Sequence, residues 1–142
     1  NNVFPDDRTA VVVLTNQDAA SASGEIASGI SQLLFATTGD AATPAKLEQA
    51  KKIFDGLQKG TIDRTLFTDN CNFYFSEQAL KDFATSLAPF GTPVSFVQVG
   101  QGLRGGMTLR RYVIRFQQKS LVAWTYEMPD GKLEQFQVAG QN

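Results

Sequence analysis

The chain has 142 residues, of which 42% are hydrophobic and 19% charged, and its 11 Phe residues are typical of a folded domain with a core. Thirteen Lys and Arg against 14 Asp and Glu give a net charge of −1, so we expect no nucleic-acid partner. No apolar run approaches the roughly 20 residues of a membrane span, so we expect no membrane partner. With no His and a single Cys, Cys71, the chain cannot form a His–Cys zinc site, a His-based triad or an intrachain disulfide.

The N-terminal part predicts one strand followed by one helix. Residues 9–15 are a continuous, largely β-branched run, the pattern of a strand covered on both faces. Asn16 or Asp18 can cap the helix that follows, in which apolar residues recur at helical spacing to about Ala36. The polar, small-residue stretch 37–43 then predicts a linker.

A second helix is predicted from Thr43-Pro44 to Gly60, since Pro is favoured in the first helical turn and Gly just beyond the last. Residues 61–64 predict a short helical turn, which leads to Leu66 and Phe67. The apolar stripe of the helix consists of Leu47, Ala50, Ile53, Phe54 and Leu57.

The rest of the chain predicts one more helix and then strands. Residues 73–75 read as extended or irregular, Ser76 caps a helix whose apolar stripe reaches Leu87, and Pro89 ends it. Consecutive strands with short connections imply an antiparallel meander. The candidate strands are residues 94–99, 107–117, 121–128 and 132–139.

Three aromatic residues are candidates for a ligand cavity. Trp124 and Tyr126 alternate with Val122 on one strand face, where we expect packing in the core, with the lining of a cavity shared with Tyr74 as the alternative. An acid–base site would need a carboxylate or phenol shielded by apolar walls. The available groups are Asp55, Asp63, Asp69, Tyr74, Asp82 and Tyr126.

Arginines gather in a stretch that contains no acid between Asp82 and Glu127. Arg104, Arg111 and Arg115 are candidates for contact with an anion or an acidic partner, and a solvated sheet face is the alternative. Residues 111, 113 and 115 share one face of their strand, opposite to 112, 114 and 116.

A glycine motif, G-x-G-x-x-G at residues 100–105, precedes this strand. A dinucleotide site needs a helix after such a motif, because the pyrophosphate binds at the helix N-terminus. Here a strand follows, so the glycines predict a hairpin loop.

Residues 9–36, TAVVVLTNQDAASASGEIASGISQLLFA, resemble the closing strand and C-terminal helix of β-lactamase and penicillin-binding-protein-like serine hydrolases. The motifs that carry the chemistry of that family are absent. No Ser is followed three residues later by Lys, no Tyr-x-Asn occurs, and Lys59-Gly60-Thr61 has the wrong order for Lys-Thr-Gly. The resemblance therefore implies a remnant of a longer hydrolase, without its nucleophile and base.

Residues 44–139 resemble a nuclear transport factor 2-like domain, also called cystatin-like or SnoaL-like. The helix stripe, the Gly-Thr-Ile-Asp-Arg turn at 60–64, the third helix and the Met-Pro-Asp-Gly-Lys hairpin at 128–132 carry this resemblance. It implies an α+β fold in which helices pack on a curved four-stranded antiparallel sheet around a conical cavity. Some members of the superfamily are isomerases or dehydratases, and many are non-catalytic modules attached to enzymes.

Together these features predict a remnant strand and helix over 1–37, a linker at 38–43 and a nuclear transport factor 2-like domain over 44–142. The function we expect is that of a non-catalytic accessory domain, which packs on the hydrolase, self-associates or binds a small ligand. Its partners would be a second copy and the upstream hydrolase domain, with no cofactor and no metal. The alternatives are a small cavity enzyme that uses a shielded Asp or Tyr, and a purely structural dimerisation module. A periplasmic or secreted location is expected if the parent hydrolase carries a signal peptide.

Overall fold

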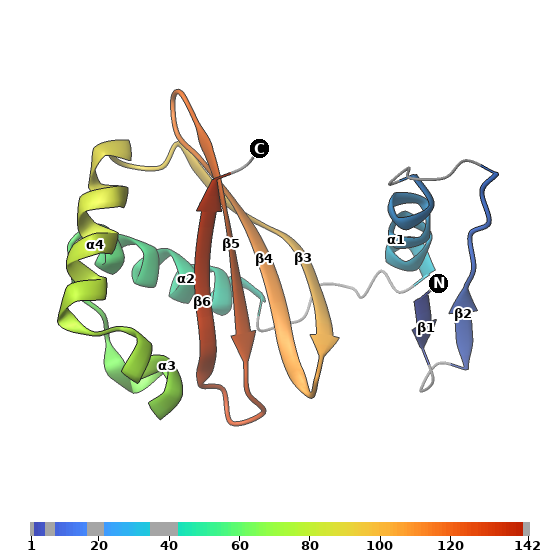
Figure 1. The fold of residues 1–142 in the computed structure, drawn as a ribbon, viewed down its shortest axis with the longest axis horizontal. Helices are drawn as coiled ribbons and strands as arrows, with labels where there is room; N and C mark the ends of the chain where they lie inside the picture. The colour runs from blue at the N-terminus through green and yellow to red at the C-terminus, as the bar shows by residue number, and fades with distance from the viewer. Residues whose placement is uncertain (1, 5–7, 17–21, 35–42, 141–142) are drawn as a thin grey trace. The chain divides into compact units, whose positions relative to one another are not determined.

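The computed structural model describes residues 2–4, 8–16, 22–34 and 43–140 (Figure 1). They belong to two units, Asn1–Thr43 and Pro44–Asn142. The fold class is α+β, with a four-stranded antiparallel sheet and several helices. None of the helices in the described ranges is both long and apolar enough to cross a membrane.

In the first unit, β2 (Thr9–Val11) pairs antiparallel with β1 (Asn2–Phe4). The predicted strand begins at Thr9 as expected but ends at Val11 instead of Thr15, and the expectation that both of its faces are covered is wrong. The side chains alternate instead: Val11 is 5% exposed, whereas Val12 is 57% exposed and lies beyond the strand. A hairpin partner close in sequence supplies the backbone hydrogen bonds of the short strand, so it needs no larger sheet for them.

The helix of the first unit, α1 (Ala22–Leu34), lies within the predicted range. The candidate cap Asp18 and most of the predicted linker lie outside the described residues. Ala27 is buried, but Ile26, Ile30 and Leu34 are exposed and follow one another at a spacing of four residues. This spacing places the three side chains on one face of the helix, which therefore presents an apolar stripe to solvent.

We predict that the full chain self-associates through its first unit, because the exposed Val12, Leu14, Ile26, Ile30 and Leu34 side chains form apolar surface that favours burial. Sedimentation should show a dimer or larger species. The double variant Ile30→Asp with Leu34→Asp should shift it toward monomer, whereas Leu103→Asp, an exposed position of the second unit, should not. A monomeric full chain would contradict the prediction.

In the second unit, α2 (Thr43–Gln58) begins and ends where the sequence predicts. Pro44 lies in its first turn, and Gly60, with a φ of 73°, follows its end. A 3₁₀ turn, η1 (Arg64–Leu66), comes slightly later than the predicted turn, since Asp63 caps it by accepting a hydrogen bond of 3.0 Å from the Thr65 amide. The predicted stripe is confirmed: Ala50, Ile53, Phe54 and Leu57 are buried, and Leu47 is partly buried.

The expectation of extended or irregular structure at residues 73–75 is wrong for Phe73 and Tyr74, because a short helix, α3 (Asp69–Tyr74), covers them, whereas Phe75 lies beyond its end and is irregular. At its start, the Thr68 hydroxyl accepts a hydrogen bond of 3.2 Å from the Cys71 amide. At its end, Arg64 donates to the carbonyls of Asn72 at 3.0 Å and Phe75 at 2.8 Å. These partners satisfy both ends of the helix and outweigh the preference of consecutive aromatic residues for strands.

The last helix, α4 (Glu77–Leu87), confirms the predicted Ser76 cap, whose hydroxyl accepts a hydrogen bond of 3.2 Å from the Ala79 amide. A 3₁₀ turn, η2 (Ala88–Phe90), follows it and contains Pro89. Gly91 then reverses the chain with a φ of 70°.

The four-stranded sheet is the predicted antiparallel meander, in the order β3 (Ser95–Arg104), β4 (Met107–Arg115), β5 (Ser120–Glu127) and β6 (Leu133–Gly140). β3 runs five residues further than expected and so includes Gly100 and Gly102. The β3–β4 turn is Gly105-Gly106, in which both residues have positive φ. The glycine motif thus belongs to a hairpin, although its first two glycines lie in a strand.

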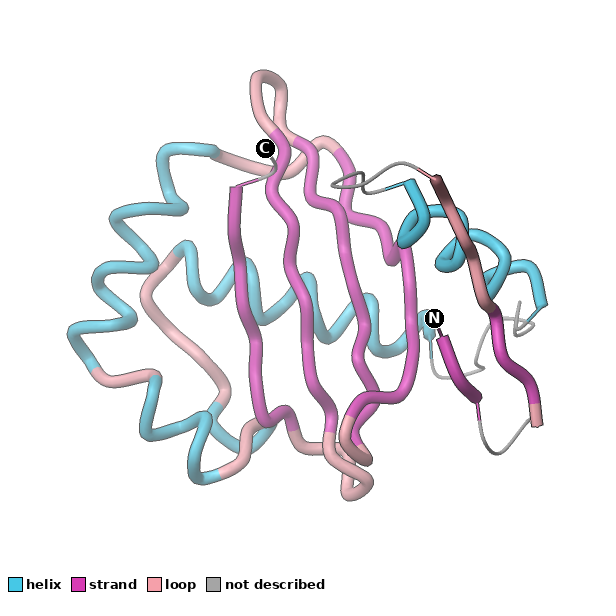
Figure 2. Tube along the Cα trace, turned by 45° about the vertical axis from the view of Figure 1, so that its right-hand side comes forward, coloured by secondary structure: helices cyan, strands magenta, loops and turns pink. Residues whose placement is uncertain are grey.

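Helices α2, α3 and α4 lie on one side of the sheet, and α2 crosses behind the strands in Figure 2. The space between helices and sheet is filled by large side chains. Phe54 lies 6.0 Å from Phe96 and 6.1 Å from Phe116 between ring centroids. The largest side chains that are less than 2% exposed are Tyr112, Phe54, Phe67, Phe75, Phe136, Leu57 and Ile114.

Trp124 and Tyr126 do not belong to this core, contrary to expectation. The side chains of a strand alternate between its faces, and Ala123 and Thr125 point toward the helices in their place. The core therefore takes the smaller residues of β5, because the Phe side chains of the helices already occupy the space beside them.

We predict that Phe54→Ala lowers the free energy of unfolding by about 3–5 kcal/mol, since a fully buried Phe leaves a cavity that the packed core fills poorly. The matched control is Phe73→Ala, at a side chain that is 89% exposed, which should change it by less than about 0.5 kcal/mol. Urea unfolding followed by circular dichroism measures both. Equal stability of the two variants would show that α2 does not depend on this contact.

Candidate functional site

The face of the sheet turned away from α2, α3 and α4, here called the open face, carries five of the six predicted site residues. Arg111 lies opposite Trp124 in the pairing of β4 with β5, and Leu109 lies opposite Tyr126. Arg104 lies opposite Met107 in the β3–β4 pair. The side chains of this face come from Val97, Arg104, Met107, Leu109, Arg111, Val113, Arg115, Val122, Trp124, Tyr126, Gln135 and Gln137.

Two of the arginines are held against the sheet. Arg104 donates a hydrogen bond of 2.9 Å to the Tyr126 hydroxyl, and its guanidinium lies 5.8 Å from the centroid of that ring. Arg111 lies over Gly100, where a Cβ atom would come within 3.1 Å of the guanidinium. Gly100 thus leaves room for the Arg111 side chain, which packs directly over its backbone.

The open face is positively charged and partly apolar. The side chains that the described strands place on it include three arginines and no carboxylate. Between the arginines lie valines and the rings of Trp124 and Tyr126, all partly exposed. A surface of this kind can bind a partner that offers both apolar contact and carboxylates.

The opposite face holds a charged cluster that the sequence analysis missed. Arg110 is 3% exposed and donates a hydrogen bond of 2.8 Å to Glu127, and Lys46 lies 3.0 Å from the same carboxylate oxygen. Beside them burial raises the pKa of Tyr112, although a hydrogen bond with Thr125 opposes the shift. The sequence carries one signal for this cluster: Arg110 and Arg111 are adjacent in a strand, so their side chains point to opposite faces of the sheet and one of them faces the helices.

Among the described residues, Glu127 is a carboxylate shielded from solvent, as a general base would be. It is, however, paired with two cations, Arg110 and Lys46. The predicted acid–base candidates do not replace it: Asp69 and Asp82 are exposed, and Asp55 forms a surface ion pair of 2.7 Å with Lys59. The Asp63 carboxylate caps η1, and its hydrogen bonds with Thr65 lower its pKa. The described part of the chain contains no group of three or more His, Cys, Asp or Glu residues that could hold a metal ion.

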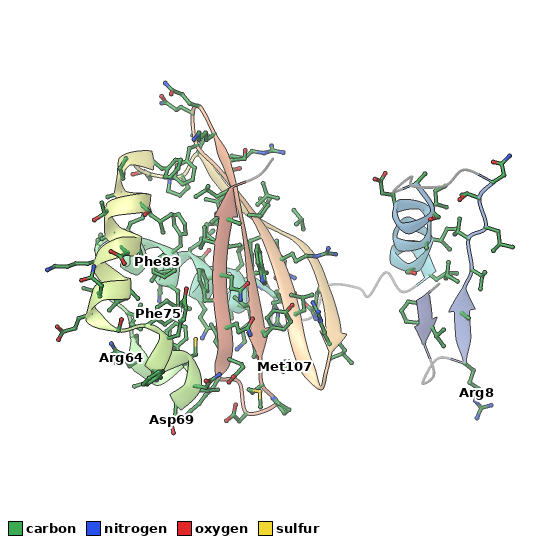
Figure 3. The ribbon with its side chains drawn as sticks, viewed as in Figure 1. Arg8, Arg64, Asp69, Phe75, Phe83 and Met107 are labelled. Carbon is green, nitrogen blue, oxygen red and sulfur yellow. The ribbon has the colours of Figure 1, made fainter. Side chains whose placement is uncertain are left out.

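The structure brings Tyr74 and Trp124 to one cleft, while Tyr126 is not among its lining residues. This open cleft, of about 870 Å³, lies between α3, α4 and β6. Figure 3 labels Phe75 and Phe83 on the helical side of the sheet, and Phe83 lines the cleft. The expected set of three cavity aromatics is therefore divided between the cleft and the open face.

Cys71 lies at the inner wall of this cleft and is 4% exposed. Burial raises the pKa of its thiol to about 11, and the Phe136 amide opposes this shift. The thiol is therefore protonated at neutral pH and is a weak nucleophile.

The chain matches no protein-family model, and neither the curated proteins nor the solved structures include a significant match. Function is therefore inferred from the chemistry of the site residues.

We predict that the chain forms no acyl-enzyme with a chromogenic β-lactam and no phosphonylated serine with a fluorophosphonate, because it has no Ser-x-x-Lys. Cys71 should react with iodoacetamide at pH 8 roughly a hundredfold more slowly in the folded than in the unfolded chain, given thiol pKa values of about 11 and 9.0. The rate should rise as the pH approaches 11. Mass spectrometry measures both reactions, with Cys71→Ala as the control, and stoichiometric acylation of that variant would contradict the prediction.

Proposed function

We propose that the chain is a non-catalytic accessory region of a β-lactamase-related serine hydrolase. Residues 44–142 would form a nuclear transport factor 2-like module that packs against the hydrolase domain through its open face. The observation that carries this proposal is the combination of a filled interior with a partly apolar outer face that bears arginines.

The filled interior favours association over a cavity enzyme. Side chains such as Phe54, Phe75 and Tyr112, each almost fully buried, fill much of the space between the helices and the sheet, and the cleft that remains beside α3, α4 and β6 is open to solvent. The shielded carboxylate on this side, Glu127, is neutralised by Arg110 and Lys46. A general base must instead be free to accept a proton from a bound substrate.

The charge of the open face favours a different protein surface over a second copy of the same face. In a symmetric pair of open faces, Arg104, Arg111 and Arg115 would meet the arginines of the partner, and like charges at an interface oppose association. A hydrolase surface that carries carboxylates would satisfy the arginines and cover Trp124 and Tyr126.

The first unit supports the hydrolase part of the proposal. Its hairpin and helix leave Val12, Leu14 and Ile30 exposed, which is expected if they pack on a larger sheet and helix layer elsewhere in the parent domain. The resemblance of residues 9–36 to the closing strand and helix of such hydrolases agrees with this exposure.

The first test is to read the gene upstream of the codon for Asn1. The proposal expects an in-frame coding sequence that contains Ser-x-x-Lys. An upstream frame that encodes no such motif would overturn the link to a hydrolase.

The second test compares the accessibility of side chains in the isolated chain and in the longer protein by hydroxyl-radical footprinting. Met107, Trp124 and Tyr126 are oxidation-sensitive reporters of the open face. We predict that their oxidation falls severalfold in the longer protein, because the hydrolase domain covers them. Phe73, which is 89% exposed on α3, is the internal control and should be oxidised equally in both.

The variant Arg111→Glu in the longer protein should restore the oxidation of Met107 and Tyr126, since it places a negative charge at the centre of the face. The control for the change of charge is Lys81→Glu, on the exposed surface of α4. Arg64→Glu is not suitable, because Arg64 donates the hydrogen bond that holds the end of α3. Equal oxidation of Met107 and Tyr126 in the isolated chain and the longer protein would contradict the proposed docking face.

A further inference from the structure

We propose that the cleft between α3, α4 and β6 is a binding site for a neutral oligosaccharide. This inference rests on the cleft and not on the proposed docking of the open face. It depends on three observations: exposed aromatic rings, amide groups that hydrogen-bond to neighbouring side chains, and the absence of cations among the residues that line the cleft.

The aromatic rings stand at the mouth of the cleft, where burial in the core does not explain them. Phe73 and Tyr74 are 89% and 62% exposed at the end of α3, and Trp124 lies on the β5 side. Tyr74 makes an edge contact with Phe75 at 5.5 Å between centroids, which restrains its ring. Exposed rings offer flat apolar faces, to which Tyr74 and Trp124 add a polar group, and such faces match the C–H faces of sugar rings.

The amides of the cleft are oriented in advance by hydrogen bonds. Gln137 Nε2 donates to Gln135 Oε1 at 3.0 Å, and Asn70 Nδ2 donates to the Glu134 carboxylate. Thr68 donates a further hydrogen bond of 2.7 Å to the same carboxylate. The Gln135 amide group and the Gln137 and Asn70 carbonyl oxygens keep further donor and acceptor capacity, which suits hydroxyl groups that both donate and accept.

The charge of the lining selects against other ligand classes. No Lys or Arg lines the cleft, so it offers no cation to a phosphate or carboxylate. Hydrogen bonds from Thr68 and Asn70 lower the pKa of Glu134, and both of its oxygens already accept hydrogen bonds. The cleft is open, and its volume of about 870 Å³ lies in the range of small-ligand sites.

The test uses three neutral probes, maltohexaose, cellohexaose and chitohexaose in its N-acetylated form, titrated into the full chain. Trp124 is the single Trp of the chain, so a saturable change in Trp fluorescence reports binding beside it. Isothermal calorimetry provides a second measurement that does not depend on Trp124. We expect at least one probe to bind with a Kd of about 1 mM or tighter.

Two variants place the binding in the cleft. Tyr74→Ala removes a ring and Gln135→Ala removes an oriented amide, and each should weaken the bound probe about three- to tenfold. Both positions are exposed, so the variants should fold, which circular dichroism verifies. Leu103→Ala, 82% exposed and not among the lining residues, should bind the probe like the unmodified chain, as should Arg111→Glu.

The outcomes separate this inference from the proposed function. No saturable signal for any of the three probes up to about 10 mM would overturn the saccharide site. Binding that is unchanged in both Tyr74→Ala and Gln135→Ala would overturn it as well. Neither result bears on docking of the open face, which is tested by Arg111→Glu and by footprinting of Met107 and Tyr126.

Discussion

The contact of α2 with the sheet is the constraint on which the larger unit depends. Phe54 is 1% exposed, and the centroid of its ring lies about 6 Å from those of Phe96 and Phe116. Burial of such a ring contributes a large share of the few kcal/mol by which a domain of this size is stable. Because the face of the sheet toward the helices excludes water, the strands turn apolar side chains toward the helices. The residues that alternate with these along each strand then point to the other face of the sheet.

The open face follows from this requirement. Once Tyr112 and Ile114 point into the core, Arg111 and Arg115 must point outward. Arg110 and Thr125 are exceptions, since both are buried on the inner side, and Arg110 is compensated there by Glu127. A buried ion pair of this kind contributes little net stability, but removal of either partner would leave an uncompensated charge. The face toward the helices is therefore structural, while the outer face is available for contact.

The cleft and the open face are two different chemical surfaces that meet at β5 and β6. Gln135 and Gln137 lie on the open face and also line the cleft, and so does Trp124. On one side of it stand arginines, and on the other stand the amides of Gln135 and Gln137. Trp124 therefore stands between two surfaces of different charge within the same unit.

Local sequence determined the elements with strong signals. The stripe from Leu47 to Leu57, the Ser76 cap and the turn at residues 129–131 predicted helices and hairpin strands correctly, because each depends on neighbours in the chain. The grouping of Arg111 and Arg115 on one strand face was predictable for the same reason. The tertiary structure alone decided which face is buried, since Trp124 and Tyr126 could fill either side and only the Phe side chains of the helices excluded them from the core. It also decided that Tyr74 and Trp124 share a cleft, because that contact joins residues far apart in sequence. The helix at residues 69–74 depends on a nearer partner, Arg64, whose hydrogen bonds to the carbonyls of Asn72 and Phe75 no helical or strand spacing predicts.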